Sequence, residues 1–331
     1  MEEIPGMLGR SPAMRSLFEA MARVTGCDHD MVVHVHGETG TGKEKVARAL
    51  HERSPRRRGP FVAVNGAGSS DELFEAQFFG HARGAFTGAL ADGPGHVAVA
   101  EGGTLFLDEV ADLSLGNQAR LLRFFQEWEY RRVGETRLRK ADVRVLTAAN
   151  ADLSRRVAEG RFRQDLFFRL GMVLHVPPLR ERGEDVLLLA RHFLEREARA
   201  AGRPCPRGTV EFWRAVRGFD WPGNVRQLEH EVKRLVVMTE AAWLTRDHLA
   251  PEVAQARPAA RVPLRSAMET FEREYLTRVL ERHGGVRKAA AAALGITRQA
   301  LHAKMRRLRI EDGRGPGPRP RGREARPPEG P

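Results

Sequence analysis

One glycine-rich segment constrains the fold of this 331-residue chain more than any other feature; it reads Gly37-Glu38-Thr39-Gly40-Thr41-Gly42-Lys43. An apolar, β-branched run over residues 31–36 precedes it, and a helical pattern over residues 45–51 follows it. This context is that of a P-loop, whose backbone N–H groups surround phosphate oxygens while the lysine reaches the terminal phosphates. A chance glycine turn is the alternative, but the strand, the spacing and the helix together favour a phosphate site. Glu44 stands where a P-loop ordinarily has Ser or Thr, so a magnesium ligand must come from elsewhere.

Two acids close another apolar run. Residues 104–107 are followed directly by Asp108 and Glu109. In a nucleotide site Asp108 would hold Mg²⁺, directly or through water, and Glu109 would orient the attacking water. Alone, two acids at a strand end are more often a solvated turn, but their place after a P-loop favours a Walker B site. Asn150, after the β-rich run 143–147, is a further candidate for a position next to the γ-phosphate.

Short β-rich runs alternate with longer helical patterns in the first half of the chain. The runs cover residues 31–36, 61–64, 104–107, 143–147 and 172–176. This alternation predicts an α/β fold with a parallel sheet and crossover helices over residues 1–178.

The remainder of the chain has helical patterns only. After Pro178 the β-branched runs stop and apolar residues recur at helical spacing, which predicts a helical lid subdomain over 179–252. A Pro/Ala/Arg-rich linker is expected over 253–265, and a second all-α domain over 266–311. Residues 312–331 are mostly Gly, Pro and Arg and predict a disordered basic tail.

The positive charge is concentrated near the C-terminus. Residues 257–331 hold 18 Lys and Arg and 8 Asp and Glu, a net charge of +10, whereas the whole chain has +12. A basic excess confined to one part of a chain indicates a module that binds a polyanion. A solvated basic tail is the alternative that the charge alone leaves open.

Cysteine usage and hydropathy exclude several protein classes. Cys27 and Cys205 are far apart and belong to no CxxC or Cys/His cluster, so two ordinary thiols are expected and neither a zinc site nor a disulfide framework. No apolar run approaches the roughly 20 residues that a bilayer requires, and the acidic start is unlike a signal peptide. The sequence therefore predicts a cytoplasmic protein without a membrane partner.

With these motifs the sequence resembles the central domain of the sigma-54-dependent activators, the bacterial enhancer-binding proteins of the AAA+ family. GETGTGKE is that family's form of the Walker A motif, which accounts for Glu44. The most specific element is Gly84-Ala85-Phe86-Thr87-Gly88-Ala89, the GAFTGA sequence that marks the family's loop for contacting sigma-54. Chemically, Phe and Thr between glycines give a bendable loop with an exposed apolar tip, a feature that indicates a partner. The resemblance covers about residues 4–310.

The resemblance implies a role for several further residues, and ATP with Mg²⁺ as cofactors. Asn65 resembles the switch asparagine that holds the Walker B glutamate until the γ-phosphate changes. Arg163 and Arg169 resemble the arginine fingers that reach a neighbouring subunit's ATP, where a fixed positive fork neutralises charge on the transferred phosphoryl group. Arg226, in Trp-Pro-Gly-Asn-Val-Arg, resembles the sensor II arginine that reports the nucleotide state to the lid.

The chain also departs from the family pattern. Ala149 stands where a threonine is usual, Gln164 replaces a glutamate between the two arginines, and Gln77 with Phe78 alters the run before GAFTGA. These changes bear on the rate of hydrolysis more than on its existence.

Two histidines raise a separate question. His34 and His36 share one face of a strand at a spacing compatible with a metal, but the sequence offers no further ligand. Packed strand histidines are therefore the favoured interpretation.

The C-terminal domain has the pattern of a helix-turn-helix. Residues 286–297 predict a helix, a glycine turn and Thr297 as the N-cap of a second helix over 298–308. In that helix an apolar stripe consists of Leu301, Met305 and Leu308. The opposite face is the expected major-groove reader, and its residues are Arg298, Gln299, His302 and Arg306.

Other basic residues of this domain are expected at the DNA backbone: Arg287, Lys288, Lys304 and Arg307. A basic helical domain with an ordinary solvated face is the alternative. The pattern resembles the Fis-type helix-turn-helix of the same activators. The preceding helix carries an apolar stripe that fits either dimerisation or packing within one domain, made of Met268, Phe271, Leu276, Val279 and Leu280.

Taken together, these features predict an activator that binds enhancer DNA, forms a ring, expected to be a hexamer with an inactive dimer, and uses ATP hydrolysis to remodel sigma-54 RNA polymerase. Two other classes are an AAA+ DNA-processing motor, which has no use for GAFTGA, and a non-enzymatic repressor with a vestigial ATPase fold. About 30 residues precede the first predicted strand. We therefore expect the regulatory signal to come from a separate protein, a ligand on the ring, or expression.

Overall fold

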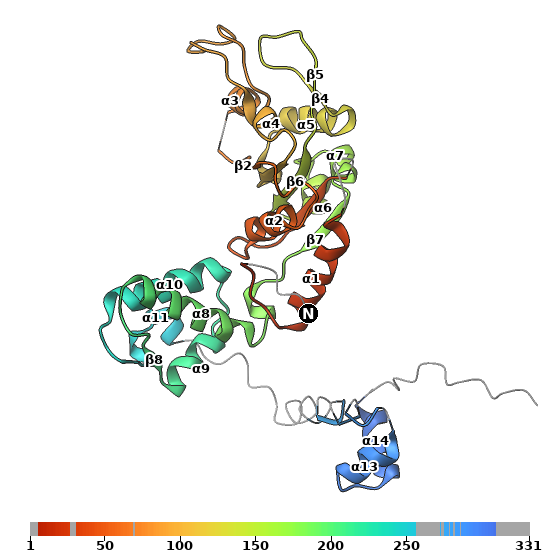
Figure 1. The fold of residues 1–331 in the computed structure, drawn as a ribbon, viewed down its shortest axis with the longest axis vertical. Helices are drawn as coiled ribbons and strands as arrows, with labels where there is room; N and C mark the ends of the chain where they lie inside the picture. The colour runs from red at the N-terminus through yellow and green to blue at the C-terminus, as the bar shows by residue number, and fades with distance from the viewer. Residues whose placement is uncertain are drawn as a thin grey trace, which may run out of the picture. The chain divides into compact units, whose positions relative to one another are not determined.

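The chain divides into two compact units, Met1–Pro258 and Ala259–Pro331 (Figure 1). The computed structural model describes residues 6–26, 31–68, 70–255, 272, 275–277, 279–280, 282–284 and 286–308. Cys27, the greater part of the predicted linker, Met268, Phe271 and the predicted tail 312–331 lie outside the described residues. Within the described part, no helix has the length and apolar character needed to cross a membrane.

A five-stranded parallel sheet forms the centre of the first unit, in the order β2-β3-β6-β1-β7. Its strands are β1 (Val33–His36), β2 (Phe61–Asn65), β3 (Thr104–Asp108), β6 (Arg144–Ala149) and β7 (Met172–His175). All five β-rich runs found in the sequence are strands of this sheet, so the predicted fold class is confirmed. The register pairs Asn65 with Asp108 and His36 with Ala149. The strands therefore end together, and the residues that follow them meet at one edge of the sheet.

Helices cover both faces of the sheet, as expected for parallel strands that are apolar on both sides. One core cluster packs Val33, Val35 and Phe106 against α1 (Pro12–Val24) and α2 (Lys43–Glu52). A second cluster packs Leu105 and Leu107 against the helices of the other face. The remaining elements of this part are α3 (Asp71–Phe79), α4 (Gly95–Val99), η1 (Val110–Asp112), α5 (Leu115–Glu127), β4 (Glu129–Tyr130), β5 (Arg139–Lys140), α6 (Leu153–Ala158) and α7 (Gln164–Arg169).

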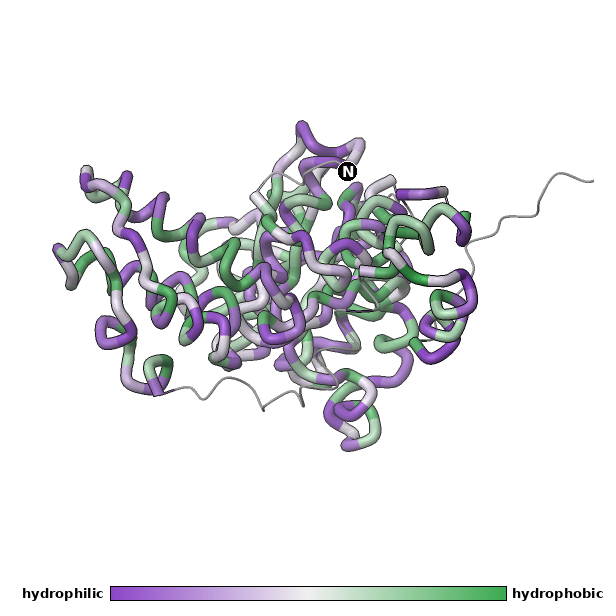
Figure 2. The backbone as a smooth tube through the Cα atoms, turned by 90° about the horizontal axis from the view of Figure 1, so that it is seen from below, coloured by the Kyte–Doolittle hydropathy of each residue, from purple (hydrophilic) through white to green (hydrophobic). Residues whose placement is uncertain are grey.

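The lid has a helical core of its own around Trp221, which is fully buried and donates from Nε1 to Val216 O at 2.9 Å. Its elements are η2 (Leu179–Glu181), α8 (Asp185–Ala200), β8 (Arg207–Gly208), α9 (Val210–Gly218), α10 (Asn224–Met238), β9 (Trp243–Leu244), η3 (Arg246–His248) and α11 (Pro251–Ala254). The backbone in Figure 2 alternates between hydrophilic and hydrophobic along such helices, which have one buried face.

Two details of the lid differ from the sequence analysis. The short parallel pair β8–β9 was not expected, because two-residue strands leave no periodic pattern. The predicted linker began at residue 253, but Val253 is buried in the lid core, so this start was two residues or more too early. The helix α11 begins at Pro251, where a proline at the first helical position is favourable rather than terminating.

The second unit contains the predicted helix-turn-helix. Its helices are α13 (Arg287–Ala293) and α14 (Arg298–Arg307), and Gly295 in the turn has a positive φ of 64°. The Thr297 hydroxyl accepts from Ala300 N at 3.2 Å and caps α14 as predicted. Among the described residues, Leu276 and Leu280 pack in the same cluster as Leu301 and the rest of the predicted stripe, which favours packing within one domain for these two.

Candidate functional site

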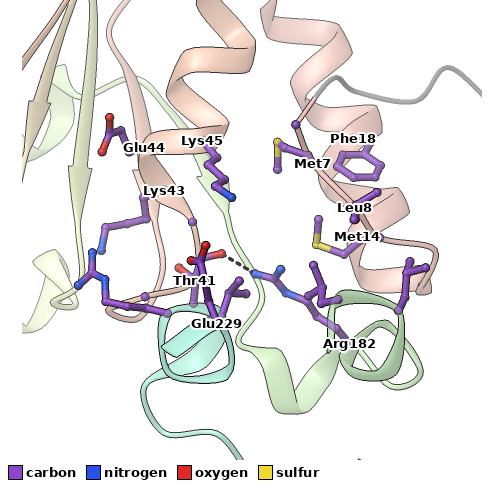
Figure 3. A pocket seen from close by; sticks show the side chains of 18 of the residues that line it. Met7, Leu8, Met14, Phe18, Thr41, Lys43, Glu44, Lys45, Arg182 and Glu229 are labelled. Atoms are coloured by element: carbon purple, nitrogen blue, oxygen red, sulfur yellow. Dashed lines mark hydrogen bonds between the residues drawn. The ribbon is translucent and has the colours of Figure 1, made fainter. Parts of the chain in front are cut away.

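A cavity of about 930 Å³ lies between the P-loop and the lid (Figure 3). Its polar walls come from residues 39–45, from Asp108 and Glu109 at the end of β3, and from Arg226 at the start of α10. Its apolar walls come from the segment before α1, from α1 itself and from the lid. These are chiefly Met7, Leu8, Met14, Phe18, Leu189, Phe193 and Val225. The cavity thus has one end suited to phosphates and another suited to a flat, apolar base.

The glycines of the P-loop permit its tight course over the end of β1. Gly40 and Gly42 have positive φ values of 78° and 103°, which side chains rarely adopt. Gly42 is the N-cap of α2 and has no capping side chain, so the first N–H groups of that ten-residue helix face the cavity end. The loop therefore presents backbone donors where phosphate oxygens are expected.

Lys43 lies inside the site and is held by the protein itself. Its Nζ is 3.1 Å from Gly37 O and 3.4 Å from Glu109 Oε1, and its side chain is only 7% exposed. An ammonium group so placed can exchange these partners for phosphate oxygens. The Lys43–Glu109 contact also brings together the P-loop and the second motif, which are 66 residues apart.

The acid pair has the electrostatics of a metal site. Burial, and then the nearby Glu109 carboxylate, raise the pKa of Asp108. A divalent cation would remove that penalty, and carboxylate oxygens are ligands that Mg²⁺ prefers. No cluster of three or more His, Cys, Asp or Glu side chains able to hold a metal occurs within the described ranges. Mg²⁺ ordinarily binds one or two carboxylates together with substrate phosphates.

Glu109 has the geometry of a functional residue. Its backbone is left-handed, with φ 53°, a conformation that costs a side-chain-bearing residue energy and is frequent at active sites. Its Oε2 accepts from Asn150 N at 3.2 Å, and Asn150 Nδ2 donates to Thr39 Oγ1 at 3.2 Å. The structure therefore brings Asn150 to the P-loop and to Glu109.

Asn65 lies at the same edge but is not joined to Glu109. Its Oδ1 accepts from Ala67 N at 2.9 Å, while Glu109 is held by Lys43 and Asn150. The contact expected of a switch asparagine is thus not made in this conformation.

Two glutamates of the P-loop segment are held in ion pairs. Glu38 forms a bidentate pair with Arg180 of η2, and its pKa is lowered to about 2, chiefly by hydrogen bonds from that arginine and then from Asn224. Glu44 pairs with Arg48 one turn further along α2, at 3.1 Å. Glu38 is therefore a contact to the lid rather than a direct ligand, a role that the sequence analysis missed.

A backbone hydrogen bond holds the expected sensor arginine against the P-loop. Arg226 N donates to Gly40 O at 3.2 Å, and its exposed side chain lines the cavity. The two expected arginine fingers lie elsewhere. Arg163 pairs with Asp165 at 2.7 Å, and Arg169 donates to Phe125 O at 2.6 Å. Neither is among the described residues that line the cavity of its own chain.

The GAFTGA segment is a closed, hydrogen-bonded loop between α3 and α4. Gly84 N donates to Ala89 O at 2.8 Å, and the two flanking glycines have positive φ. The Phe86 and His81 rings make an edge-type contact, with centroids 5.1 Å apart, and Phe86 is 44% exposed. Leu90, directly after the motif, is 86% exposed. In Figure 1 this loop projects from the end of the α/β part that is remote from the lid.

The two strand histidines are packed against their neighbours in the sheet. His34 is buried, and its Nδ1 lies 2.9 Å from Thr147 Oγ1 on the neighbouring strand. The rings of His36 and His175 of β7 make a T-shaped contact, with 5.5 Å between centroids. This supports the interpretation as packed strand histidines.

The second unit presents a basic hollow on the predicted reading face. Its lining residues are Arg287, Arg298, Gln299, His302, Ala303, Arg306 and Arg307. Four of these were predicted to read bases, and they are exposed as expected. Lys304 differs, because its ammonium group pairs with Glu272, which Arg307 also contacts. In this structure Lys304 therefore stabilises the domain through an ion pair and is not directed at a DNA phosphate.

Sequence comparison identifies all three parts of the chain. Residues 7–175 match the family described as "Sigma-54 interaction domain", residues 180–265 the "AAA+ ATPase lid domain", and residues 267–308 "Bacterial regulatory protein, Fis family". The chain belongs to the sigma-54-dependent activators. It is an AAA+ ATPase with a Fis-type helix-turn-helix, and its expected partners are sigma-54 and DNA.

Individual relatives agree with this assignment. The transcriptional regulatory protein ZraR from Klebsiella oxytoca is 44% identical over 308 residues, which cover 91% of this chain and 69% of the relative. The DNA-binding transcriptional regulator NtrC from Azospirillum brasilense is 45% identical over 283 residues, covering 85% and 57%. Among solved structures, NtrX from Brucella abortus in complex with ATP has a TM-score of 0.69 at 35% identity, covering 92% of this chain and 69% of NtrX.

Proposed function

We propose that the chain binds enhancer DNA through its second unit and uses ATP hydrolysis to remodel sigma-54 RNA polymerase for open-complex formation. The observation that carries the proposal is the GAFTGA loop, which is complete, exposed and separate from the nucleotide cavity. A DNA-processing motor would need the P-loop but not this loop.

The chemistry is assigned to residues at the end of the sheet. Lys43 transfers from Gly37 O and Glu109 to the terminal phosphates, and the P-loop N–H groups bind the remaining oxygens. Asp108 is the residue that would hold Mg²⁺, which supplies charge neutralisation at the phosphates. Glu109, freed by the lysine, orients the attacking water and accepts its proton. The nucleotide itself is supported by the relative NtrX, which was crystallised with ATP and with ADP.

The complete site includes a neighbouring subunit. Arg163 and Arg169 lie outside the cavity of their own chain, so we propose that they serve the ATP of the adjacent subunit in a ring, expected to be a hexamer that forms from an inactive dimer. Since Arg163 pairs with Asp165 in the single chain, ring assembly must exchange that contact for phosphate. A trans-acting regulatory protein could act on this assembly step.

The test separates ATP hydrolysis from the action on sigma-54 polymerase. Phe86→Ala and Thr87→Ala should each retain ATP hydrolysis and enhancer binding while losing binding to sigma-54 polymerase in the presence of an ATP transition-state analogue. The reason is that a glycine-flanked tip can lose a side chain without changing the core, whereas an interface centred on one aromatic anchor loses several kcal/mol.

Transcription activation and phosphate release are measured for wild type and both variants. Wild-type activation by both variants would refute the role of the loop and the sigma-54 assignment with it. Absence of phosphate release from the wild type would instead favour a non-enzymatic repressor.

A further inference from the structure

Three side chains from separate segments connect the P-loop to the lid: Glu38, Arg180 and Asn224, together termed the latch. Arg180 donates from Nη1 and Nη2 to the two oxygens of Glu38, at 2.8 and 2.6 Å. Asn224 Nδ2 donates to Glu38 Oε2 at 3.1 Å and to Thr39 O at 3.0 Å. The Glu38 carboxylate thus has donors from both lid segments.

Asn224 is the fixed point of this arrangement. It is fully buried, its φ is 53°, and its Oδ1 accepts from Leu179 N at 2.8 Å. The Oδ1 and Nδ2 atoms of Asn224, at the first turn of α10, therefore connect that helix to the segment after β7 and to the P-loop. Arg226, two residues later, is bonded through its N–H to Gly40 O and lines the cavity. The position of the expected sensor arginine is consequently set by contacts to the P-loop.

The latch also carries a charge directly beside the P-loop residues that line the cavity. Glu38 is adjacent in sequence to Thr39, which lines the cavity where phosphates are expected. A carboxylate there repels the negative phosphates unless a cation compensates it, and Arg180 supplies that cation in bidentate geometry. The pKa of Glu38 is lowered to about 2, so the carboxylate stays ionised even well below neutral pH.

We propose that the latch is a positioning device for the nucleotide: Arg180 neutralises Glu38 so that phosphates can bind beside it, and Asn224 aligns the sensor helix with the P-loop. These residues act through the P-loop and are not catalytic. The inference rests on the proposed nucleotide site and is independent of the contact with sigma-54.

Arg180→Gln is the decisive variant. It should weaken ATP and ADP binding about fivefold at low salt, because Glu38 is left as an uncompensated charge near the phosphates. At high salt the loss should shrink, because the repulsion is screened. The double variant Glu38→Gln/Arg180→Gln should bind nucleotide as well as Glu38→Gln alone, since no carboxylate remains to be neutralised. Arg180→Lys keeps the charge and should retain most of the affinity.

Arg217→Gln is the matched control. It also removes one lid arginine from an exposed ion pair, with Glu184 at 2.5 Å, and Arg217 is not among the residues that line the nucleotide cavity. Affinities for fluorescent ATP and ADP analogues are measured at two salt concentrations on the full chain, with thermal unfolding of every variant.

Equal affinities for Arg180→Gln and Arg217→Gln would overturn the proposal, as would additive losses in the double variant. A loss that does not change with salt would show a merely structural role. Failure of the wild type to bind nucleotide would contradict the proposed site, and the latch with it, whereas loss of sigma-54 binding alone would leave the latch standing.

Discussion

Gly40→Ala tests whether the P-loop and the lid are in obligatory contact. A Cβ at this position would lie 2.3 Å from Gly223 O and 3.1 Å from Arg226 Cβ. Gly42→Ala is the matched control, because Gly42 also has a positive φ but a Cβ there would meet nothing within 4 Å. The two variants thus share backbone strain and differ in the clash with the lid.

The expected costs follow from these geometries. A non-glycine residue in the left-handed region costs about 1–2 kcal/mol, which applies to both variants. At residue 40 the methyl group must also move the Gly223 carbonyl by roughly 1 Å to reach an ordinary contact, and overpacking of this kind costs about 1–3 kcal/mol. Gly40→Ala should therefore lose about 2–5 kcal/mol of unfolding free energy, against about 1–2 kcal/mol for Gly42→Ala.

Urea unfolding of the protein without nucleotide measures both losses and avoids any direct contact between the new methyl group and a phosphate. ATP hydrolysis by Gly40→Ala should also fall, by up to about 100-fold, because the displaced lid carries Arg226 with it. Equal destabilisation by the two substitutions would refute the close approach of Gly40 to α10. Normal hydrolysis by Gly40→Ala would refute its functional importance.

Three further predictions concern other parts of the chain. Glu109→Gln should keep ATP binding and lose nearly all phosphate release, since Asp108 remains and only the activation of water is lost; turnover within about threefold of wild type would contradict this role. A fragment of residues 265–310 should bind DNA with an affinity that falls steeply as salt rises, measured by fluorescence anisotropy, and salt-independent binding would count against phosphate contacts. Burial, then His36, lowers the pKa of His34 to about 3. Between about pH 6.5 and 3, only the unfolded chain binds a proton at this histidine. The free energy of unfolding should therefore decrease as the pH is lowered, by about 1 kcal/mol between pH 6 and pH 5. Thermal unfolding of His34→Gln should lack this part of the acid sensitivity, and an unchanged pH profile would disprove it.

The sequence predicted the phosphate end of the site because each part is a contiguous motif at the end of a strand. Parallel strands that share a register must end at the same edge, so the P-loop, Asp108 with Glu109, and Asn150 come together without further information. Thr297 was predictable for the same kind of reason, since an N-cap depends only on the residues that follow it.

The lid side of the site could not be predicted in this way. The bonds from Glu38 to Arg180 and Asn224 join residues 142 and 186 positions apart. No periodicity links such residues, and glutamate in a P-loop is compatible with either a ligand or a partner in an ion pair. The same applies to Met7 and Leu8, whose short apolar run shows no function until α1 and the lid enclose it.

The GAFTGA loop shows a further limit, because the sequence identified the loop but not the most exposed large apolar side chain beside it. A phenylalanine between glycines was expected to stand free, yet its ring packs against His81, which the backbone holds by pairing with Gly93. An aromatic ring is stabilised by burying apolar surface and by edge-to-face contact, so about half of the Phe86 surface is buried in the absence of a partner.

Leu90, directly after the motif, has no such ring contact and remains 86% exposed. An interface centred on Phe86 alone would leave this leucine in water, at a loss of the burial that a hydrophobic contact provides. Leu90→Ser therefore belongs beside Phe86→Ala in the sigma-54 binding assay: if Leu90 is buried in the complex, its replacement weakens binding while ATP hydrolysis stays unchanged, and unaltered binding would confine the contact to the hexapeptide.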